Sequence, residues 1–435
     1  MIAHLEALGQ TLLALARQHR DGSLATLEQA VLGAVRQASA DLLADVLQLS
    51  TTSLRPATAH WRQVCPHCGQ RVRAHEWRSR TVLTVCGPVT WQRPWFHCPR
   101  CRQGFSPADE VLGIVPRGRL SAGLVAWIVE LGAQTTFRDG ASGLERLTGL
   151  KVSAETVRQH TEASGTLLEA AQQTAMAEVV RTRQPAQALD PAPGTLLVQT
   201  DGVMVRYLDG WHEVKLGLVG GQVEGELRLP SYVAARASAE QFGPRLLAEA
   251  ARRGALEIIA WQGAVTGRGL AVLPTVVVLG DGAVWIWNLA AEHFGQRIEI
   301  VDYYHATEHL WTLARAFYGE GTAKAKRWAQ RQCRRLLTRG PGPLLRALGA
   351  IKARSAESTA VLRRERAYFR ANAARMAYPT LREQGLPIGS GAIESEAKRL
   401  VQQRLKRPGA RWSTSGAEAV LNLRCRLLSN LPLAC

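Results

Sequence analysis

The sequence predicts a multidomain protein of mixed α+β class, and three observations lead to this prediction. Its 435 residues are enough for two to four separate cores. Apolar residues recur at helical spacing in the N-terminal part, then as short strands after residue 195, and again at helical spacing from residue 304. Two C-x-x-C pairs precede the strands. These changes divide the chain into six predicted regions: residues 1–58, 59–110, 115–183, 195–303, 304–380 and 381–435.

The charge balance indicates a polyanionic partner. The chain carries 54 Lys and Arg against 36 Asp and Glu, a formal charge of +18. Basic side chains that neutralise phosphates release counterions, so this excess favours DNA. No signal-peptide pattern is found, and the most apolar stretch, Leu270–Trp287, is interrupted by Pro274 and Asp281. We therefore expect a cytoplasmic protein, nucleoid-associated when bound to DNA, with reduced cysteines and no membrane partner.

Residues 1–58 are predicted to form a helical arm. Leu and Ala recur there at helical spacing, and Gly22 with Ser23 separates two helices. Two interpretations stay open for this arm: it mediates dimerisation, or it covers the next region.

Two cysteine pairs predict a zinc ribbon in residues 59–110. Cys65 and Cys68 form the first pair, Cys98 and Cys101 form the second, and the stretch between them is rich in strand-forming residues. Four thiolates complete the closed tetrahedral shell of a structural Zn²⁺ ion. Cys86 lies between the pairs and is expected in a hairpin, not among the ligands. The alternative is redox-active or incidental thiols.

Residues 115–183 are predicted to form a helical domain that resembles a helix-turn-helix. A turn at residues 149–152 is followed by Ser153, which is expected to cap a helix. Arg158 and Gln159 lie on the expected exposed side of that helix, where they would contact DNA. Plain helix packing is the alternative, because short helix pairs of this kind are common.

After a proline-marked linker at residues 185–194, the pattern changes to strands. They are predicted at residues 196–200, 212–219, 226–233, 274–280 and 297–301, with a helix capped by Ser238 and Gln241 after the third. An RNase H-like fold has this order of strands and helices. The helical pattern after residue 304 would then be an insertion in that core.

Three acids are the predicted catalytic residues. Asp201 and Asp281 close the first and fourth strands, and Glu394 lies far downstream in residues 389–395. Rigid strand ends can hold carboxylates at metal-bridging distance. Phosphodiester chemistry by two Mg²⁺ or Mn²⁺ ions needs such a set, with Asp201 bridging the ions, Asp281 sharing one and Glu394 holding the other.

Alternatives exist for each acid. An Asp followed by Gly, as at Asp201 and Asp281, is also ordinary turn chemistry. Asp302 ends the next strand and competes with Asp281 as the second acid. Glu396 competes with Glu394, and positions two apart on a helix point in different directions, so only one of them can be a ligand.

Three segments resemble the ISKra-type insertion-sequence transposases of bacteria, which are DDE enzymes of RNase H-like fold near the Mutator-like group. They read LGDGAVWIW at residues 279–287, DYYH at residues 302–305 and GSGAIES at residues 389–395. The resemblance extends from the cysteine pairs to the C-terminus. It implies the same acidic triad, and it implies that Asp302 and His305 form a D-x-x-H signature before a helical insertion.

The resemblance also points to Arg327 and Trp328, because an Arg-Trp pair in related insertions stacks on a displaced base. Independently, residues 320–380 hold 15 Lys and Arg against 3 Asp and Glu. Further basic residues follow the triad glutamate and are predicted to contact DNA phosphates: Lys398, Arg399, Arg404, Lys406, Arg407 and Arg411. The alternative is that tryptophans fill helix cores and arginines are solvated.

These features predict a DDE transposase that cuts the ends of its insertion sequence and joins them to target DNA. Hydrolysis would free a 3′-hydroxyl, which then attacks a target phosphodiester at the same metal pair. Assembly on two DNA ends favours a homo-oligomer. Two other functions fit less of the chain: a structure-selective nuclease of the same fold, and a zinc-ribbon, helix-turn-helix regulator whose acids only form turns.

Overall fold

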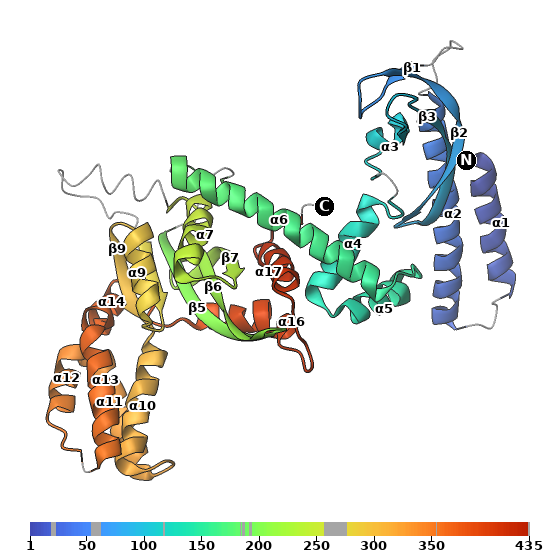
Figure 1. Cartoon of the computed structure of the whole chain (residues 1–435). Helices are drawn as coiled ribbons and strands as arrows, with labels where there is room; N and C mark the ends of the chain where they lie inside the picture. The colour runs from blue at the N-terminus through green and yellow to red at the C-terminus, as the bar shows by residue number, and fades with distance from the viewer. Residues whose placement is uncertain are drawn as a thin grey trace. The chain divides into compact units, whose positions relative to one another are not determined.

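The protein is a mixed α+β molecule with two β-sheets (Figure 1). The computed structural model describes residues 1–18, 23–53, 62–115, 118–182, 184, 188–190, 194–255, 276–353 and 355–433. The chain divides into two compact units, Met1–His160 and Thr161–Ala434. Most of the predicted linker, and the first two residues of the predicted strand 274–280, lie outside the described residues. The finer division into six regions stays a prediction.

The first unit contains a four-stranded antiparallel sheet of order β1-β2-β3-β4. Its elements are α1 (Ile2–Gln18), α2 (Leu24–Ser53), β1 (Arg62–Val64), β2 (Arg71–Thr84), β3 (Gly87–His97), β4 (Gly104–Phe105), α3 (Pro107–Val111), α4 (Ala122–Gln134), α5 (Phe137–Thr148) and the start of α6 (Ala154–Thr182).

Helix α2 covers the long β2–β3 hairpin. Ala40 of α2 belongs to one apolar cluster with Val89 and Trp91 of β3. The Gln48 side chain reinforces this contact, because its Oε1 accepts the Gln92 amide at 2.9 Å. Helix α2 is therefore a cap on the ribbon, one of the two roles open for the arm, whereas α1 has no buried residue.

Helices α4, α5 and α6 form the predicted helix-turn-helix segment of the first unit. Each begins at a hydroxyl cap: Ser121, Thr136 and Ser153 accept the backbone amide three residues on. Gly149 ends α5 with a φ of +70°, a left-handed conformation that glycine adopts without a Cβ clash. These local signals explain why the helix boundaries follow the sequence so closely.

The second unit is built on a five-stranded sheet of order β7-β6-β5-β8-β9. Its elements up to the last strand are β5 (Thr195–Tyr207), β6 (Gly210–Val223), β7 (Glu226–Ala235), α7 (Ala239–Arg252), β8 (Val276–Gly280), α9 (Val284–His293) and β9 (Arg297–Val301). The helices after the sheet are α10 (Tyr303–Tyr318), α11 (Ala323–Arg339), α12 (Pro341–Gly349), α13 (Ala356–Ala371), η1 (Ala373–Met376), α14 (Tyr378–Glu383), α15 (Gly391–Glu396), the π-helical η2 (Ala397–Gln402), α16 (Gln403–Leu405) and α17 (Thr414–Leu428).

Strands β7, β6 and β5 are antiparallel, whereas β8 and β9 run parallel to β5. Helices cover both faces of this sheet. Gly217 faces α7, because a Cβ there would lie 2.6 Å from Leu246. The next cross-strand pair, Gln199 with Leu218, faces the opposite side of the sheet. There Gln199 Oε1 accepts a hydrogen bond from the Ile393 amide of α15 at 3.0 Å. The central strands are therefore buried on both sides, as their continuous apolar runs predict.

The predicted end of the first strand at Thr200 is wrong. Strand β5 continues through Asp201 and Gly202 to Tyr207, because β6 pairs with it along the whole hairpin. Gly202 therefore lies inside a paired strand and not in a turn. Strand β8 pairs with β5 only as far as Gln199, and Asp201 therefore lies just beyond the end of that parallel pairing.

The described part of the apolar stretch Leu270–Trp287 forms strand β8, a short turn and the start of α9, as the sequence predicts. Within the ranges that the structure describes, no helix combines the length and the apolar character needed to cross a bilayer.

Candidate metal centre and candidate active site

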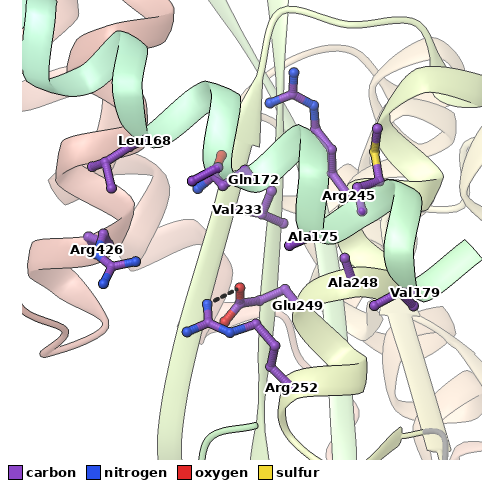
Figure 2. Close-up of a pocket in the computed structure, with 12 residues that line it drawn as sticks. Leu168, Gln172, Ala175, Val179, Val233, Arg245, Ala248, Glu249, Arg252 and Arg426 are labelled. Carbon is purple, nitrogen blue, oxygen red and sulfur yellow. Dashed lines mark hydrogen bonds and ion pairs between the residues drawn. The ribbon is translucent and has the colours of Figure 1, made fainter. Parts of the chain in front are cut away.

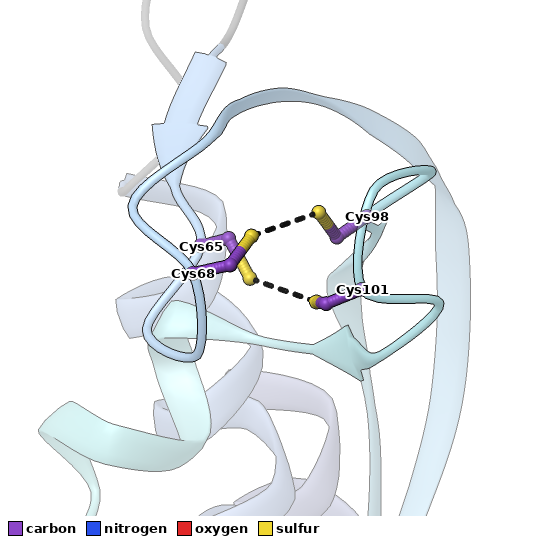
Figure 3. Close-up of side chains that lie close together, drawn as sticks. All are labelled: Cys65, Cys68, Cys98 and Cys101. Carbon is purple, nitrogen blue, oxygen red and sulfur yellow. Dashed lines mark hydrogen bonds between the residues drawn. The ribbon is translucent and has the colours of Figure 1, made fainter.

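Four cysteines of the ribbon form one compact group (Figure 3). The Sγ atoms of Cys65, Cys68, Cys98 and Cys101 all lie within 4.8 Å of one another. The sulfurs of Cys65 and Cys101 are 3.6 Å apart, and those of Cys68 and Cys98 are 3.5 Å apart. A tetrahedral zinc shell with Zn–S bonds of about 2.3 Å has sulfur–sulfur edges of about 3.8 Å. This group can therefore hold a structural metal such as zinc, and Cys86 lies outside it in the hairpin turn, as predicted.

The two cysteine pairs fold alike because their sequences, CPHCGQ and CPRCRQ, are alike. In each, the amide of the first cysteine donates to the carbonyl of the glutamine five residues on, at 2.9 Å. The residue before that glutamine is left-handed in both: Gly69 has a φ of +73° and Arg102 a φ of +59°. The backbone amide of Cys101 lowers the pKa of the Cys98 thiol to about 7, which favours a thiolate ligand.

The three predicted catalytic acids line one cavity of about 270 Å³ in the second unit. Asp201 comes from β5, Asp281 follows β8, and Glu394 lies on α15. His305, from the first turn of α10, lines the same space. The structure thus brings together four residues that are separated by up to 193 positions in the chain.

These carboxylates are more widely spaced than the cysteines. Apart from the four sulfurs, no set of three or more Cys, His, Asp or Glu ligand atoms in the described ranges has all members within 4.8 Å of one another. The acids therefore do not form a closed shell around one ion.

Each acid has one anchored oxygen. Asp201 Oδ1 accepts the next amide at 2.7 Å, Asp281 Oδ1 accepts the amide two residues on at 2.8 Å, and Glu394 Oε1 accepts the Ser390 hydroxyl at 2.9 Å. No described residue donates a hydrogen bond to the second oxygen of any of these carboxylates. Each side chain is thus oriented by its own segment and retains an oxygen for a cation.

Asp201 is electrostatically central in the cavity. Burial raises its pKa, the Gly202 amide lowers it, the charges of Asp281 and Glu394 raise it further, and His305 lowers it. Asp201 therefore experiences both of the other acids, which is the position that a bridging ligand requires.

Neither of the competing acids lines this cavity. Asp302 is fully buried and caps α10: its Oδ1 accepts the His305 amide at 2.6 Å and its Oδ2 accepts the Ser390 amide. Both of its oxygens are thus used by the backbone. Glu396 is buried and pairs with Arg399 at 2.7 Å. Geometry therefore favours Asp281 and Glu394 as cavity ligands, and Asp302 serves as a clamp between α10 and the segment before α15.

Asp281 is supported by a group of side chains that the sequence did not predict. The Tyr368 hydroxyl of α13 donates to the Asp281 carbonyl at 3.2 Å, and its ring packs on Gly282. His309 stacks on the Tyr368 ring with centroids 3.7 Å apart, and its Nδ1 lies 2.5 Å from the buried carboxylate of Glu365. The sequence offers one sign of this group, since His309 lies four residues after His305 on the same predicted helix. Its partners Glu365 and Tyr368 lie 56 or more residues downstream, so the sequence does not connect them.

The predicted DNA-reading residues of the helix-turn-helix lie at its surface. Gln159 is exposed and Arg158 half-buried. Both contact Glu155 one turn earlier, with Arg158 Nη2 at 2.6 Å and Gln159 Nε2 at 2.9 Å from Glu155 Oε1. A base or phosphate contact by either residue would have to compete with this carboxylate.

Trp328, which the resemblance pointed to as a base-stacking residue, is buried, which agrees with the alternative that the tryptophans fill helix cores. Trp328 is 6% exposed, and its ring lies 6.2 Å from that of Tyr318 and 6.5 Å from that of Phe317 inside the helical core. Its neighbour Arg327 is exposed on the other side of α11 and stays a candidate for DNA contact. The helical periodicity of α11 explains the difference, since adjacent residues point about 100° apart.

Five of the six basic residues that were predicted after Glu394 to contact DNA are exposed, and one is not. The exposed residues are Lys398, Arg399, Lys406, Arg407 and Arg411. Arg404 is 3% exposed, and its guanidinium stacks 4.8 Å from the ring of the buried Trp412. Arg404 is therefore not accessible for DNA contact in this structure, because its charge faces an indole and not the solvent.

A separate cavity of about 210 Å³ lies between α6, α7 and β7 (Figure 2). Its walls are largely apolar, and its three arginines have protein partners: Arg252 lies 3.0 Å from Glu249, Arg245 contacts Glu169, and Arg426 donates to the Pro432 carbonyl at 2.7 Å. We assign no chemistry to this cavity, because its arginines are already bound within the protein.

Comparisons with known proteins give a partial family match and one distant relative, and they name no reaction. The profile of a family described as "Uncharacterised protein family (UPF0236)" matches residues 23–190. A Streptococcus gallolyticus protein named "UPF0236 protein in vanSb 3′region" is 24% identical over 356 residues, which cover 79% of this chain and 72% of that protein. Neither description names a transposase, so the resemblance to ISKra-type enzymes stays a prediction.

Among solved structures, NurA bound to dAMP and manganese matches with 13% identity and a TM-score of 0.11. The match covers 64% of this chain and 63% of the NurA chain, less than two thirds of its length. A likeness this slight carries no argument.

Proposed function

We propose that this protein is a DDE transposase, which cleaves DNA at the ends of its own mobile element and joins the freed ends to target DNA. The observation that carries the proposal is the single cavity lined by Asp201, Asp281 and Glu394 with His305. Each acid keeps one oxygen that no described residue occupies, and the surrounding chain is strongly basic.

The sheet supports an RNase H-like assignment for the catalytic core. An antiparallel hairpin and third strand are followed by two strands parallel to the first, in the order β7-β6-β5-β8-β9. Two of the acids lie at or just beyond the same edge of the parallel strands. Parallel strands bring their carboxyl ends together, so this arrangement suits a site that assembles ligands from separate segments.

The donor set fits divalent cations. It consists of carboxylate oxygens, the ligands that Mg²⁺ and Mn²⁺ prefer, and the mutual repulsion at Asp201 would be relieved by positive charge. We infer that Asp201 would bridge two ions, with Asp281 and Glu394 each holding one. The bound cations would activate the attacking oxygen and stabilise the leaving oxygen.

The other residues would position the DNA. His305 faces the cavity with 39% of its side chain exposed and can donate a hydrogen bond to a phosphate oxygen. The exposed basic residues of α11 and of the segment after Glu394 would neutralise flanking phosphates. In the first unit, a zinc-loaded ribbon would stabilise the DNA-binding helices. Handling of two ends favours a homo-oligomer.

The test is an assay with purified protein and labelled duplexes that carry the gene's own flanks, in Mg²⁺ or Mn²⁺. We expect metal-dependent nicking and strand joining that Asp281→Ala abolishes while DNA binding persists. Glu292→Ala removes an acid of α9 that is 68% exposed and lines no acid cavity, so it is the matched control.

Any other outcome would change the proposed function or the proposed triad. Cutting without joining would indicate the structure-selective nuclease. Binding that needs no metal, with uncut DNA at every flank tried, would favour the regulator. Cutting that survives Asp281→Ala would remove Asp281 from the triad.

A further inference from the structure

A second, larger cavity adjoins the acid cavity. Its volume is about 580 Å³, and its walls come from the β5–β7 strands and from the segment 385–392 that precedes α15. Tyr304 lines both cavities. The two spaces therefore share one aromatic wall, and a strand with its phosphate at the acids would have its neighbouring nucleotide at Tyr304.

Tyr304 is held in place but is not covered. Its side chain is 66% exposed, which is unusual for a large aromatic residue in a folded unit. One part of its ring packs against the backbone of Gly389, where a Cβ would lie 2.9 Å from the ring carbon Cε2. The adjacent amide of Tyr303 donates to the Ile388 carbonyl at 2.8 Å and fixes the start of α10 against this segment. The ring is thus a rigid, solvent-exposed aromatic surface.

One polar atom of the residues that line the cavity has no protein partner. Gln222 Oε1 is buried and has no hydrogen-bond partner among the described residues. A buried amide oxygen without a partner costs free energy unless a ligand satisfies it. Arg382 is exposed at the same cavity and offers positive charge, while Leu197, Leu227 and Ile388 supply apolar walls.

We propose that this cavity binds an unpaired nucleobase of the DNA strand whose phosphate lies at the acids. The base would stack on Tyr304, and its polar edge would hydrogen-bond to the Gln222 amide. Arg382 would contact the phosphate on the far side of that nucleotide. This inference rests on the proposed function, because it assumes that DNA occupies the acid cavity.

Chemistry favours a base over other occupants. A planar π-system gains about 1–3 kcal/mol per stacked base on an aromatic side chain, and every base has such a face. The Gln222 amide matches the donor and acceptor pattern of a base edge, whichever way its oxygen and nitrogen are oriented. Enzymes that must reach atoms inside a duplex gain selectivity by holding a base out of the stack.

The experiment measures binding without cleavage. Full-length protein is titrated, in Ca²⁺, into a single strand and into flank duplexes that carry one unpaired 2-aminopurine. We expect quenching of its fluorescence by the wild type. Tyr304→Ala should lose the quenching and bind about 5- to 150-fold more weakly, whereas Tyr304→Phe should retain both. Gln222→Leu should weaken binding about 2- to 10-fold.

Two controls separate stacking from general damage. Trp211→Ala removes an aromatic residue that is 55% exposed and lines neither cavity, so it should bind like the wild type. An abasic site at the unpaired position should abolish the difference between wild type and Tyr304→Ala. Thermal melting of each variant checks folding.

The inference would be overturned by full quenching in Tyr304→Ala, or by equal weakening in Trp211→Ala. It would also fail if the Tyr304→Ala deficit persisted on abasic DNA. Metal-dependent cleavage without Tyr304-dependent quenching would refute the base site and leave the proposed function standing. Tyr304-dependent quenching on DNA that is never cut would do the reverse.

Discussion

The protein holds two groups of metal-ligand side chains, and they are built in opposite ways. In the ribbon, Cys65, Cys68, Cys98 and Cys101 converge until all four sulfurs lie within 4.8 Å. In the second unit, three acids line a cavity of about 270 Å³ without such convergence. Four sulfurs around one ion would leave no position for a substrate. The acid cavity, in contrast, has space for cations and for a substrate.

The two groups are held in place by different kinds of contact. Each cysteine pair is positioned by one short turn with its own backbone hydrogen bonds. The acids are positioned by tertiary structure. The Asp281 carbonyl accepts a hydrogen bond from Tyr368 of a distant helix. Glu394 accepts a hydrogen bond from the hydroxyl of Ser390, whose amide is in turn bound by Asp302. A closed structural site can thus be local, but an open site for two cations and DNA needs elements from across the unit.

Loss of the ribbon metal should have the largest effect on structure. Structural zinc sites contribute apparent free energies of about 10–16 kcal/mol, so Cys68→Ser or a strong chelator should unfold the ribbon. We expect fast hydrogen exchange across β1 to β4, with β5 and β6 still protected. Cys86→Ser is the matched control, because Cys86 lies outside the group. Unchanged metal content and protection in Cys68→Ser would contradict a structural metal there.

Asp302→Ala should be the next most damaging change, and it separates a structural acid from the cavity acids. The substitution leaves two amides without an acceptor, the part-buried amide of His305 and the buried amide of Ser390. Each costs about 1–3 kcal/mol, so the free energy of unfolding should fall by roughly 2–4 kcal/mol. Asp281→Ala should lose less, since Asp281 accepts only one described amide. Urea unfolding of both variants measures this, and equal losses would show that Asp302 is not the clamp.

The sequence predicted the cysteine site better than the acid site, because local turns hold the first and tertiary structure holds the second. The cysteine cluster was fully predictable, because C-P-x-C turns fold from local sequence. The end of β5 at Thr200 was mispredicted, since pairing with β6 carries the strand through Asp201 and Gly202 despite their low strand propensity. The sequence around Trp328 and Arg404 does not distinguish them from exposed residues nearby. Their burial follows only from the packing of the folded chain.

Tyr304 and Gln222 gave no signal at all in the sequence. They are 82 positions apart, and their common cavity exists only after the segment before α15 closes over β6. The order of strands and helices, by contrast, followed from apolar patterning, because continuous apolar runs mark the buried strands and helical spacing marks the helices.

Asp201→Asn should stabilise the metal-free protein, which distinguishes an open acidic site from a closed one. Because the folded-state pKa of Asp201 is raised, its ionisation costs stability as pH rises from the unfolded value of about 3.9 through the folded value. The gain in Tm from Asn should therefore be absent below pH 4, grow above it and persist at neutral pH. Added Mg²⁺ should reverse the order by stabilising only the wild type. A lower Tm for the variant at pH 7 without metal would refute mutual repulsion among the acids.

The smallest expected effect lies in the turn that differs between the cysteine pairs. Arg102 has a φ of +59°, where Gly69 occupies the equivalent position of the first pair. A left-handed side-chain residue costs about 1–2 kcal/mol, partly offset by the entropy that glycine loses on folding. Arg102→Gly should therefore stabilise the ribbon by roughly 0.5–1 kcal/mol, and Gly69→Ala should destabilise it by a similar amount. Arg100→Gly, two residues earlier and not left-handed, is the control and should lower stability. Melting of the metal-loaded protein decides the matter: a loss in Arg102→Gly would mean that the arginine side chain, and not the turn, stabilises the second pair.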